Sequence, residues 1–181
     1  MYDEILDVAE QLFMKQGYQA TSTRQITEAL GVTQPTIYYH FKKKEDIYYE
    51  VMVRLSKDVK VHLEAFAQSS EGTLETKLLQ MVEYLKEKHP MNLFVMMHDI
   101  QHTLTEELSF KLYQLFVTSY QQPFIQLLEE NSNHLRQAVD IKLAVSQLFI
   151  LIAAYLDDGY RQENNFSEKL YLYLHGIYQG E

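Results

Sequence analysis

The chain has 181 residues, a formal net charge of −9 and no cysteine, so disulfides and thiolate metal sites are excluded. Its 46% hydrophobic content is that of a globular protein, and no apolar run is long enough to cross a membrane. We therefore expect a soluble, cytoplasmic protein with no membrane partner. Only three prolines and six glycines interrupt the chain, which favours long helices.

The first thirty residues predict two helices joined by a short turn. Residues 2–16 carry apolar residues three or four positions apart, and Gly17 ends this first helix. Ser22 forms a capping box with Gln25 at the start of the second helix. Gly31 closes the second helix, at a position where a C-terminal cap needs positive φ. The inward-facing apolar residues of the two helices are Ile5, Ala9, Leu12, Phe13, Ile26, Ala29 and Leu30.

A third, short helix is expected over residues 34–40. Thr33 is its N-cap, and Pro35 lies in its first turn, where a missing N–H costs nothing. Ile37 and Phe41 are four apart and turn inward together, which leaves outside the polar and aromatic residues Gln34, Thr36, Tyr38, Tyr39 and His40. A helix of this kind, entered through a glycine turn, is typical of a helix-turn-helix DNA reader. The alternative is a helix hairpin that only packs.

Residues 5–51 resemble the DNA-binding domain of the TetR family of bacterial transcriptional regulators. The matching features are the run Ala9–Leu12–Phe13–Gly17–Tyr18, Thr23 with Ile26, Ala29–Leu30–Gly31–Val32, Ile37–Tyr38–Tyr39–His40–Phe41 and Lys44–Glu45–Asp46–Ile47. Beyond residue 51 the chain agrees with the family only in length and helical character. The resemblance implies an all-α fold of about nine helices, with a three-helix DNA-binding domain over 1–46 and a ligand-binding and dimerisation domain over 47–181.

The expected DNA contacts come from the second and third helices and from the start of the fourth. Glutamine is able to pair with adenine, and threonine methyls are able to meet the thymine methyl. Tyrosine hydroxyls and lysine suit phosphate, and the family resemblance assigns backbone contacts to the positions of Tyr38, Lys44 and Thr23. The predicted DNA-binding set is Thr23, Arg24, Thr33, Gln34, Thr36, Tyr38, Tyr39, His40 and Lys44.

The charge is unevenly distributed along the chain. Residues 1–60 carry a net charge of −1, and residues 61–181 carry −8. Positive charge in the N-terminal part gathers at Arg24 and at the run Lys42, Lys43 and Lys44. Because local charge decides DNA binding, the acidic remainder is expected to help orient the reading face rather than prevent binding. Lys43 departs from the resembled pattern, which often has a small polar cap there.

Six further helices are expected beyond residue 43. The fourth, 44–68, links the N-terminal part to the rest, and 69–73 is a polar linker. The fifth, 73–88, stops before Pro90, and the sixth covers 91–102. A second capping box, Thr103 with Glu106, opens a seventh helix to residue 130, followed by a turn at 131–134. The eighth covers 136–158, and the ninth is capped by Asn165 or Ser167 and ends at 178.

The sixth and seventh helices are rich in methionine and aromatic residues. Flexible methionine beside aromatic rings suits an adaptable apolar pocket, although ordinary core is the alternative for each residue. With the family resemblance, we expect a small apolar or amphipathic effector to bind at Phe94, Met97, His98, Tyr113, Phe116 and Tyr120.

The eighth helix is apolar nearly all round, which predicts burial on several sides. It is either a central core helix or part of a dimer interface. The family resemblance implies a four-helix bundle made by the last two helices of each subunit, with an interface at Leu148, Ile152, Tyr155, Tyr171, Leu174 and Tyr178.

His98 and His102 are four apart and are able to share a metal or haem, with Asp99 or His89 nearby, but two pocket or surface histidines are the preferred interpretation. We expect no metal, no cofactor and no enzymatic activity. The predicted function is a dimeric, ligand-responsive repressor that a small molecule releases from a near-palindromic double-stranded operator. The alternatives are a chromosome-associated DNA-binding factor without promoter function, and a helical small-molecule carrier.

Overall fold

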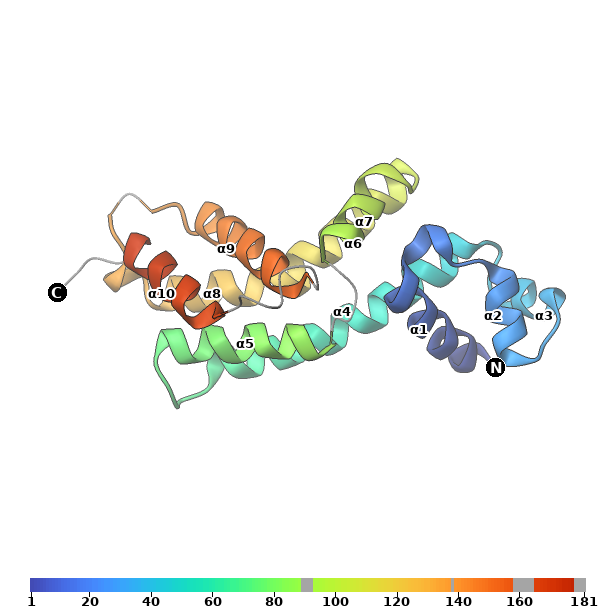
Figure 1. Ribbon diagram of the computed structural model, residues 1–181, viewed down its shortest axis with the longest axis horizontal. Coiled ribbons are helices and arrows are strands. Elements are labelled where there is room, and N and C mark those ends of the chain that lie inside the picture. Colours follow the sequence, from blue (N-terminus) through green and yellow to red (C-terminus); the bar gives the residue numbers. More distant parts are fainter. Residues whose placement is uncertain (89–92, 138, 158–164, 178–181) are drawn as a thin grey trace.

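The computed structural model describes residues 1–88, 93–137, 139–157 and 165–177, and in these ranges the regular structure is helical (Figure 1). The elements are α1 (Tyr2–Ala20), α2 (Thr23–Leu30), α3 (Gln34–His40), α4 (Lys44–Gln68), α5 (Leu74–Lys88), α6 (Leu93–His102), α7 (Glu106–Phe116), a π-helical turn (Val117–Gln121), α8 (Gln122–Glu130), a 3₁₀ turn (Ser132–His134), α9 (Ile141–Leu156) and α10 (Phe166–Ile177). The all-α expectation is confirmed.

The helices gather at the two ends of an elongated molecule (Figure 1). We call α1–α3 and the first half of α4 the N-terminal bundle, and the rest of α4 with α5–α10 the C-terminal bundle. The N-terminal bundle has a core of fully buried side chains from all four of its helices. They include Ile5, Phe13, Ile26, Ile37 and Ile47, which the sequence places inward. Leu12 and Leu30 are only partly buried, and the inward prediction for Ala29 is wrong because its side chain is exposed.

Helix α4 belongs to both bundles. Its first half packs on α1, where the Arg54 guanidinium binds Asp7 at 2.7 Å and Glu10 at 2.8 Å. It also packs against α5 and α8, and in its second half Asp58 and Ala67 accept hydrogen bonds from Tyr84 and Lys77 of α5. The division expected at residue 46 therefore lies inside a continuous helix, and the two bundles are joined by a shared element rather than by a flexible linker.

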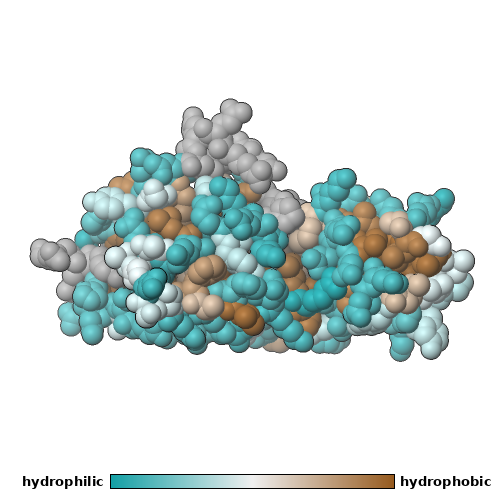
Figure 2. All heavy atoms as spheres, turned by 90° about the horizontal axis from the view of Figure 1, so that it is seen from below, coloured by the Kyte–Doolittle hydropathy of each residue, from teal (hydrophilic) through white to brown (hydrophobic). Residues whose placement is uncertain are grey.

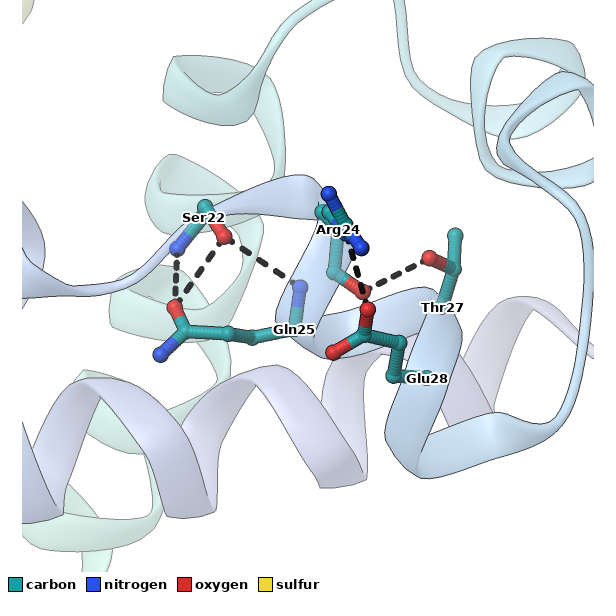
Figure 3. A network of polar contacts seen from close by, with 5 residues as sticks. All are labelled: Ser22, Arg24, Gln25, Thr27 and Glu28. Carbon is teal, nitrogen blue, oxygen red and sulfur yellow. Dashed lines mark hydrogen bonds and ion pairs between the residues drawn. The ribbon is translucent and has the colours of Figure 1, made fainter.

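Two local sequence signals are confirmed in the N-terminal bundle. The Ser22 hydroxyl accepts from the Gln25 N–H at 3.2 Å, and the Ser22 N–H donates to the Gln25 side chain at 2.7 Å, which completes the capping box (Figure 3). Gly31 caps α2 in the left-handed conformation with φ 67°. Both signals connect residues only a few positions apart, so they do not depend on distant parts of the chain.

The prediction that Gly17 ends the first helix is wrong. Gly17 adopts φ 83° and ψ 170° inside α1, and one further turn continues to Ala20. This region of backbone space is essentially restricted to glycine, so the residue makes a kink rather than a stop. The Thr21 hydroxyl donates to the Gly17 carbonyl at 2.8 Å and closes the far side of the kink.

The Thr103–Glu106 capping box is also wrong. Helix α7 begins at Glu106 with Thr105 as its N-cap residue, and the Thr105 side chain makes no capping hydrogen bond. The Thr103 hydroxyl instead accepts from Gln19 of α1 at 2.7 Å. The expected helix to residue 130 is present as α7, the π-helical turn and α8. Helix α9 begins later than expected, at Ile141, because the Asp140 side chain caps it by accepting from the Leu143 N–H at 3.1 Å.

The core of the C-terminal bundle is strongly aromatic. The Phe149 ring of α9 meets Phe116 and Phe124 edge-on, with ring centroids 5.4 Å and 5.2 Å apart. Hydrophilic residues predominate on the face in Figure 2, where apolar side chains surface in separate patches over both bundles. No helix among the described residues is long and apolar enough to span a membrane.

Candidate DNA-binding interface

Helix α3 is held in place by packing rather than by its own length. Seven residues make few internal hydrogen bonds, so an isolated helix of this size would not be stable. Ile37 is fully buried beneath it, and the buried Phe41 follows its last residue. The Tyr2 ring of α1 stacks on Phe41 at 4.9 Å. These contacts fix the helix on the N-terminal bundle with its remaining side chains outward.

The structure brings the predicted DNA-binding residues of 33–40 together on this helix. Tyr39 is 85% exposed and Tyr38 is 48% exposed, and Gln34 is exposed in the first turn. Thr33 is also exposed, and its hydroxyl bonds the Thr36 hydroxyl at 3.1 Å instead of capping the backbone. The partly buried His40 completes the group. This surface offers amide, hydroxyl and aromatic groups without an acidic side chain on α3 itself.

At the start of α2, Thr23 is partly exposed and Arg24 is exposed. The Arg24 guanidinium binds the Glu28 carboxylate at 2.8 Å within the helix (Figure 3). The hydrogen bond from Arg24 to Glu28 raises the pKa of Arg24, which stays charged. Contact between Arg24 and a DNA phosphate would therefore compete with an exposed ion pair, which contributes little to stability.

The three lysines after α3 have different surroundings. Lys42 is exposed, and Lys43 is exposed and paired with Glu45. Lys44 turns inward: its ammonium donates to the carbonyls of Tyr18 and Thr21, both at 2.8 Å, and lies 3.9 Å from the centre of the Tyr18 ring. Burial lowers the pKa of Lys44. Two of its three N–H groups are used inside the protein, so its predicted phosphate contact stays a prediction.

The predicted effector residues are not brought to one place. Phe116 and Tyr120 are buried with their rings 5.5 Å apart, whereas Tyr113 is 47% exposed. On α6, Met97 is partly buried and His98 is exposed. The side chain of Phe94 lies outside the described part of the structure. Sequence reasoning missed Tyr48 of α4, whose fully buried hydroxyl has no hydrogen-bond partner among the described residues.

Part of the predicted dimer interface is internal. Leu148 and Ile152 are fully buried within the single chain, and Tyr155 is 5% exposed. The Tyr155 hydroxyl donates to Glu83 of α5 at 2.6 Å, which ties α9 to its own bundle. These three side chains are covered by their own chain in this conformation, and their place in an interface stays a prediction. An apolar helix carries no periodic signal that would tell its inner face from its outer one.

Other apolar side chains of α9 and α10 are exposed. Leu143 and Ile150 lie on one outer face of α9, and Tyr171 and Leu172 are exposed on α10. Of the predicted interface residues, Tyr171 belongs to this surface, Leu174 is partly buried, and Tyr178 lies outside the described residues. We call Leu143, Ile150, Tyr171 and Leu172 the α9–α10 apolar face.

The histidine pair of α6 does not form a metal centre in the described structure. His98 and His102 are both exposed with ring centroids 4.8 Å apart. Asp99 is buried and accepts a hydrogen bond from the Tyr18 N–H at 3.2 Å, so it faces away from them. His89 lies outside the described ranges, which contain no group of three potential metal ligands.

Comparison with known proteins identifies the N-terminal bundle. Residues 5–51 match the family model of bacterial regulatory proteins of the tetR family. The regulator QacR of Staphylococcus aureus is 44% identical over 50 residues, which cover 28% of this chain and 27% of QacR. Residues 5–51 of the N-terminal bundle thus match the TetR family.

Longer matches to family members are weaker. The regulator AcrR of Shigella flexneri is 34% identical over 107 residues, 57% of this chain and 41% of AcrR. The repressor KstR2 of Rhodococcus jostii is 26% identical over 146 residues, 78% of this chain and 71% of KstR2. The matched part thus spans less than half of the length of QacR and of AcrR.

Solved TetR-family structures share the whole fold. FadR of Bacillus subtilis, in complex with stearoyl-CoA, superposes with a TM-score of 0.73 at 21% identity, covering 97% of this chain and 96% of FadR. A TetR-family regulator of Agrobacterium tumefaciens gives 0.77 at 17% identity, covering 98% and 97%. At these identities the likeness concerns the fold alone, and it extends over both bundles.

Proposed function

We propose that this chain is a transcriptional repressor that binds a near-palindromic operator as a homodimer and leaves it when a small molecule binds. The observation that carries the proposal is the exposed surface of α3, held by Ile37 and Phe41 on a TetR-family N-terminal bundle. A helix presented in this way is able to enter the major groove, and two copies related by a two-fold axis read half-sites about one helical turn apart.

The first test is DNA binding by the full chain. Duplexes are selected from random sequence with the wild-type protein, and fluorescence anisotropy then measures the dissociation constant at several salt concentrations. A repressor should recover a near-palindrome, and its affinity should fall steeply with salt because phosphate contacts release counterions. Failure to recover any symmetric sequence, or salt-independent binding, would contradict the proposal.

Within this interface, Gln34 is proposed to read a base and the two tyrosines to bind phosphate. Replacing Gln34 with alanine should relax the preference at one position of each half-site, at a cost of about 1–3 kcal/mol for the preferred base. The matched control is Gln101→Ala, an exposed glutamine on α6, which should leave selection unchanged. Uniform weakening on all sequences by Gln34→Ala would instead assign this side chain to the backbone.

For the effector, we propose an apolar or amphipathic molecule received by the core around Phe116 and Tyr120. The unpartnered Tyr48 hydroxyl supports a ligand with a polar atom, since buried polar groups normally have a partner. Compounds are screened by the shift of the melting temperature. A true effector must weaken operator binding by the same factor by which operator weakens effector binding, because coupling between two sites is reciprocal. Equal effector affinity with and without operator would contradict release by this compound.

A reporter gene placed behind the selected operator distinguishes the proposed repressor from a chromosome-associated factor. The repressor should lower expression, and the Gln34→Ala variant should lower it less. DNA binding in solution without an effect on the reporter would favour the chromosome-associated alternative, and absence of any DNA binding would favour the carrier.

A further inference from the structure

A buried carboxylate of the C-terminal bundle forms a hydrogen bond with the N-terminal bundle at the kink that Gly17 makes in α1. Asp99 of α6 is only 5% exposed, and its Oδ2 accepts from the Tyr18 N–H at 3.2 Å. This N–H is available because the preceding Gly17 leaves the helical conformation, with φ 83° and ψ 170°. A buried N–H without a partner is costly, so the carboxylate satisfies a donor that the kink creates.

A second contact follows on the same side. The Gln19 side chain donates to the Thr103 hydroxyl at 2.7 Å, and the Thr103 hydroxyl lies 3.5 Å from Asp99 Oδ1. The last turn of α1 is therefore held at two neighbouring points by the C-terminal end of α6. These are hydrogen bonds between residues more than eighty positions apart, and they join the two bundles directly rather than through α4.

The opposite side of the same segment is held by the first residue of α4. The Lys44 ammonium donates to the carbonyls of Tyr18 and Thr21, both at 2.8 Å. Tyr18 thus gives its N–H to an anion and its carbonyl to a cation, which matches the polarity of the backbone groups on both sides. The Tyr18 ring packs against Phe13 and Tyr48, at 6.0 Å and 4.8 Å, and fixes the segment laterally.

The hydrogen bonds that Asp99 and Lys44 make with the Tyr18 backbone lie close to α3. Only residues 41–43 separate α3 from Lys44. A displacement of α6 would move the Tyr18–Thr21 segment, and that segment bears on Lys44 and hence on the end of α3. In a symmetric dimer, a small change in the angle between the two bundles of each subunit alters the separation of the two α3 helices. Each α3 lies at the far end of the elongated subunit, so a small rotation moves it a long way (Figure 1).

We propose that Asp99 is a positioning residue for DNA binding, which sets the angle of the N-terminal bundle on the C-terminal bundle and thereby the half-site spacing that the dimer accepts. The inference rests on the proposed function, since it presupposes a dimer that reads two half-sites. Asp99 touches no DNA in this scheme. It acts through the Tyr18 N–H and through the segment that Lys44 holds from the other side.

The test compares full-length variants on three duplexes: the operator selected with the wild type, the same operator with its half-sites moved apart by two base pairs, and a single half-site. Asp99→Leu keeps the branched shape and the number of heavy atoms of the side chain, replaces the two oxygens by larger methyl groups, and removes both acceptor atoms. Asp99→Asn keeps one carbonyl oxygen able to accept from Tyr18. Gln101→Ala, an exposed change on the same helix, is the matched control. Circular dichroism measures the melting temperature of each variant.

Asp99→Leu should bind the selected operator about tenfold more weakly than the wild type, with half-site binding unchanged and with reduced preference for the selected spacing. Asp99→Asn should restore the wild-type values within about twofold, and Gln101→Ala should match the wild type. Equal losses on operator and half-site, or no loss on either, would overturn the positioning role. If the wild type itself binds no DNA, the proposed function fails and not this inference alone.

Discussion

The two bundles differ in what their relatives share with them. The family model matches residues 5–51 of the N-terminal bundle, whereas the solved structures that share the whole fold are only 21% and 17% identical to this chain. If the proposed function holds, the N-terminal bundle presents α3 to DNA of fixed geometry, so both its core and its surface are constrained. The C-terminal bundle needs only to bury its helices, and many combinations of apolar side chains achieve that.

The largest expected effect is the loss of stability when a charge is introduced into the buried side of α9. Ile152→Arg places an unpaired cation in the core of the C-terminal bundle, which should cost about 3–5 kcal/mol and unfold it. Ile150→Arg, two residues earlier and 52% exposed, should keep the fold and weaken association through the α9–α10 apolar face. Circular dichroism and analytical ultracentrifugation measure the two effects.

If the wild type sediments as a monomer at micromolar concentration, the α9–α10 apolar face does not mediate association of subunits. A folded Ile152→Arg monomer would instead reinstate Ile152 as an interface residue.

A second pair of changes separates the core from the surface of the N-terminal bundle. Ile37→Ala removes the fully buried anchor of α3 and should cost about 2–5 kcal/mol, with loss of DNA binding. Tyr39→Ala alters a side chain that is 85% exposed, so stability should change by less than about 0.5 kcal/mol while operator affinity falls. Thermal melts and anisotropy are measured on both variants. Full operator affinity in Tyr39→Ala would remove this tyrosine from the interface.

The smallest expected effect is a loss of stability in alkali at the junction of the bundles. Burial raises the pKa of Tyr18 from its ordinary 10.0 to about 12. Because the folded-state pKa lies above the unfolded one, the contribution of Tyr18 is complete below pH 10 and is lost as the pH rises toward 12. Melting temperatures at pH 8 and pH 11 should therefore differ less in Tyr18→Phe than in the wild type. Equal differences would show that Tyr18 does not contribute.

Sequence patterns correctly predicted the structural features that depend only on residues close together in the sequence. The Ser22–Gln25 capping box and the Gly31 cap depend on groups within one helical turn, and the inward positions of Ile37 and Phe41 follow from their spacing. The exposed surface of α3, which we propose reads DNA, could be located in the same way. Its contacts with DNA remain predictions, because exposure alone does not select a base or a phosphate.

Patterns failed where the partner is distant or the helix is uniformly apolar. The acceptor of the Tyr18 N–H lies 81 positions away, and no local spacing points to it. One signal was present: Met96, Asp99 and Ile100 lie three and four apart, so Asp99 shares the buried side of α6 with two apolar residues. In α9 no such signal exists, and only the packed structure distinguishes the inner Ile152 from the outer Ile150.

Helix α7, the π-helical turn and α8 follow one another without a break and form one long helical rod. The π-helical turn determines how α8 is rotated about the rod axis relative to α7. Buried side chains recur every four residues along it, at Leu108, Leu112, Phe116, Tyr120, Phe124 and Leu128. Four residues overshoot one α-helical turn of 3.6 residues, so an uninterrupted α-helix would carry this stripe gradually around to solvent. The wider turn at Val117–Gln121 absorbs an extra residue and returns the stripe to the core. Deleting one residue there would leave a plain α-helix in which α8 keeps its rotation relative to α7, so this five-residue segment is where the rod holds one residue more than a plain α-helix of the same rotation.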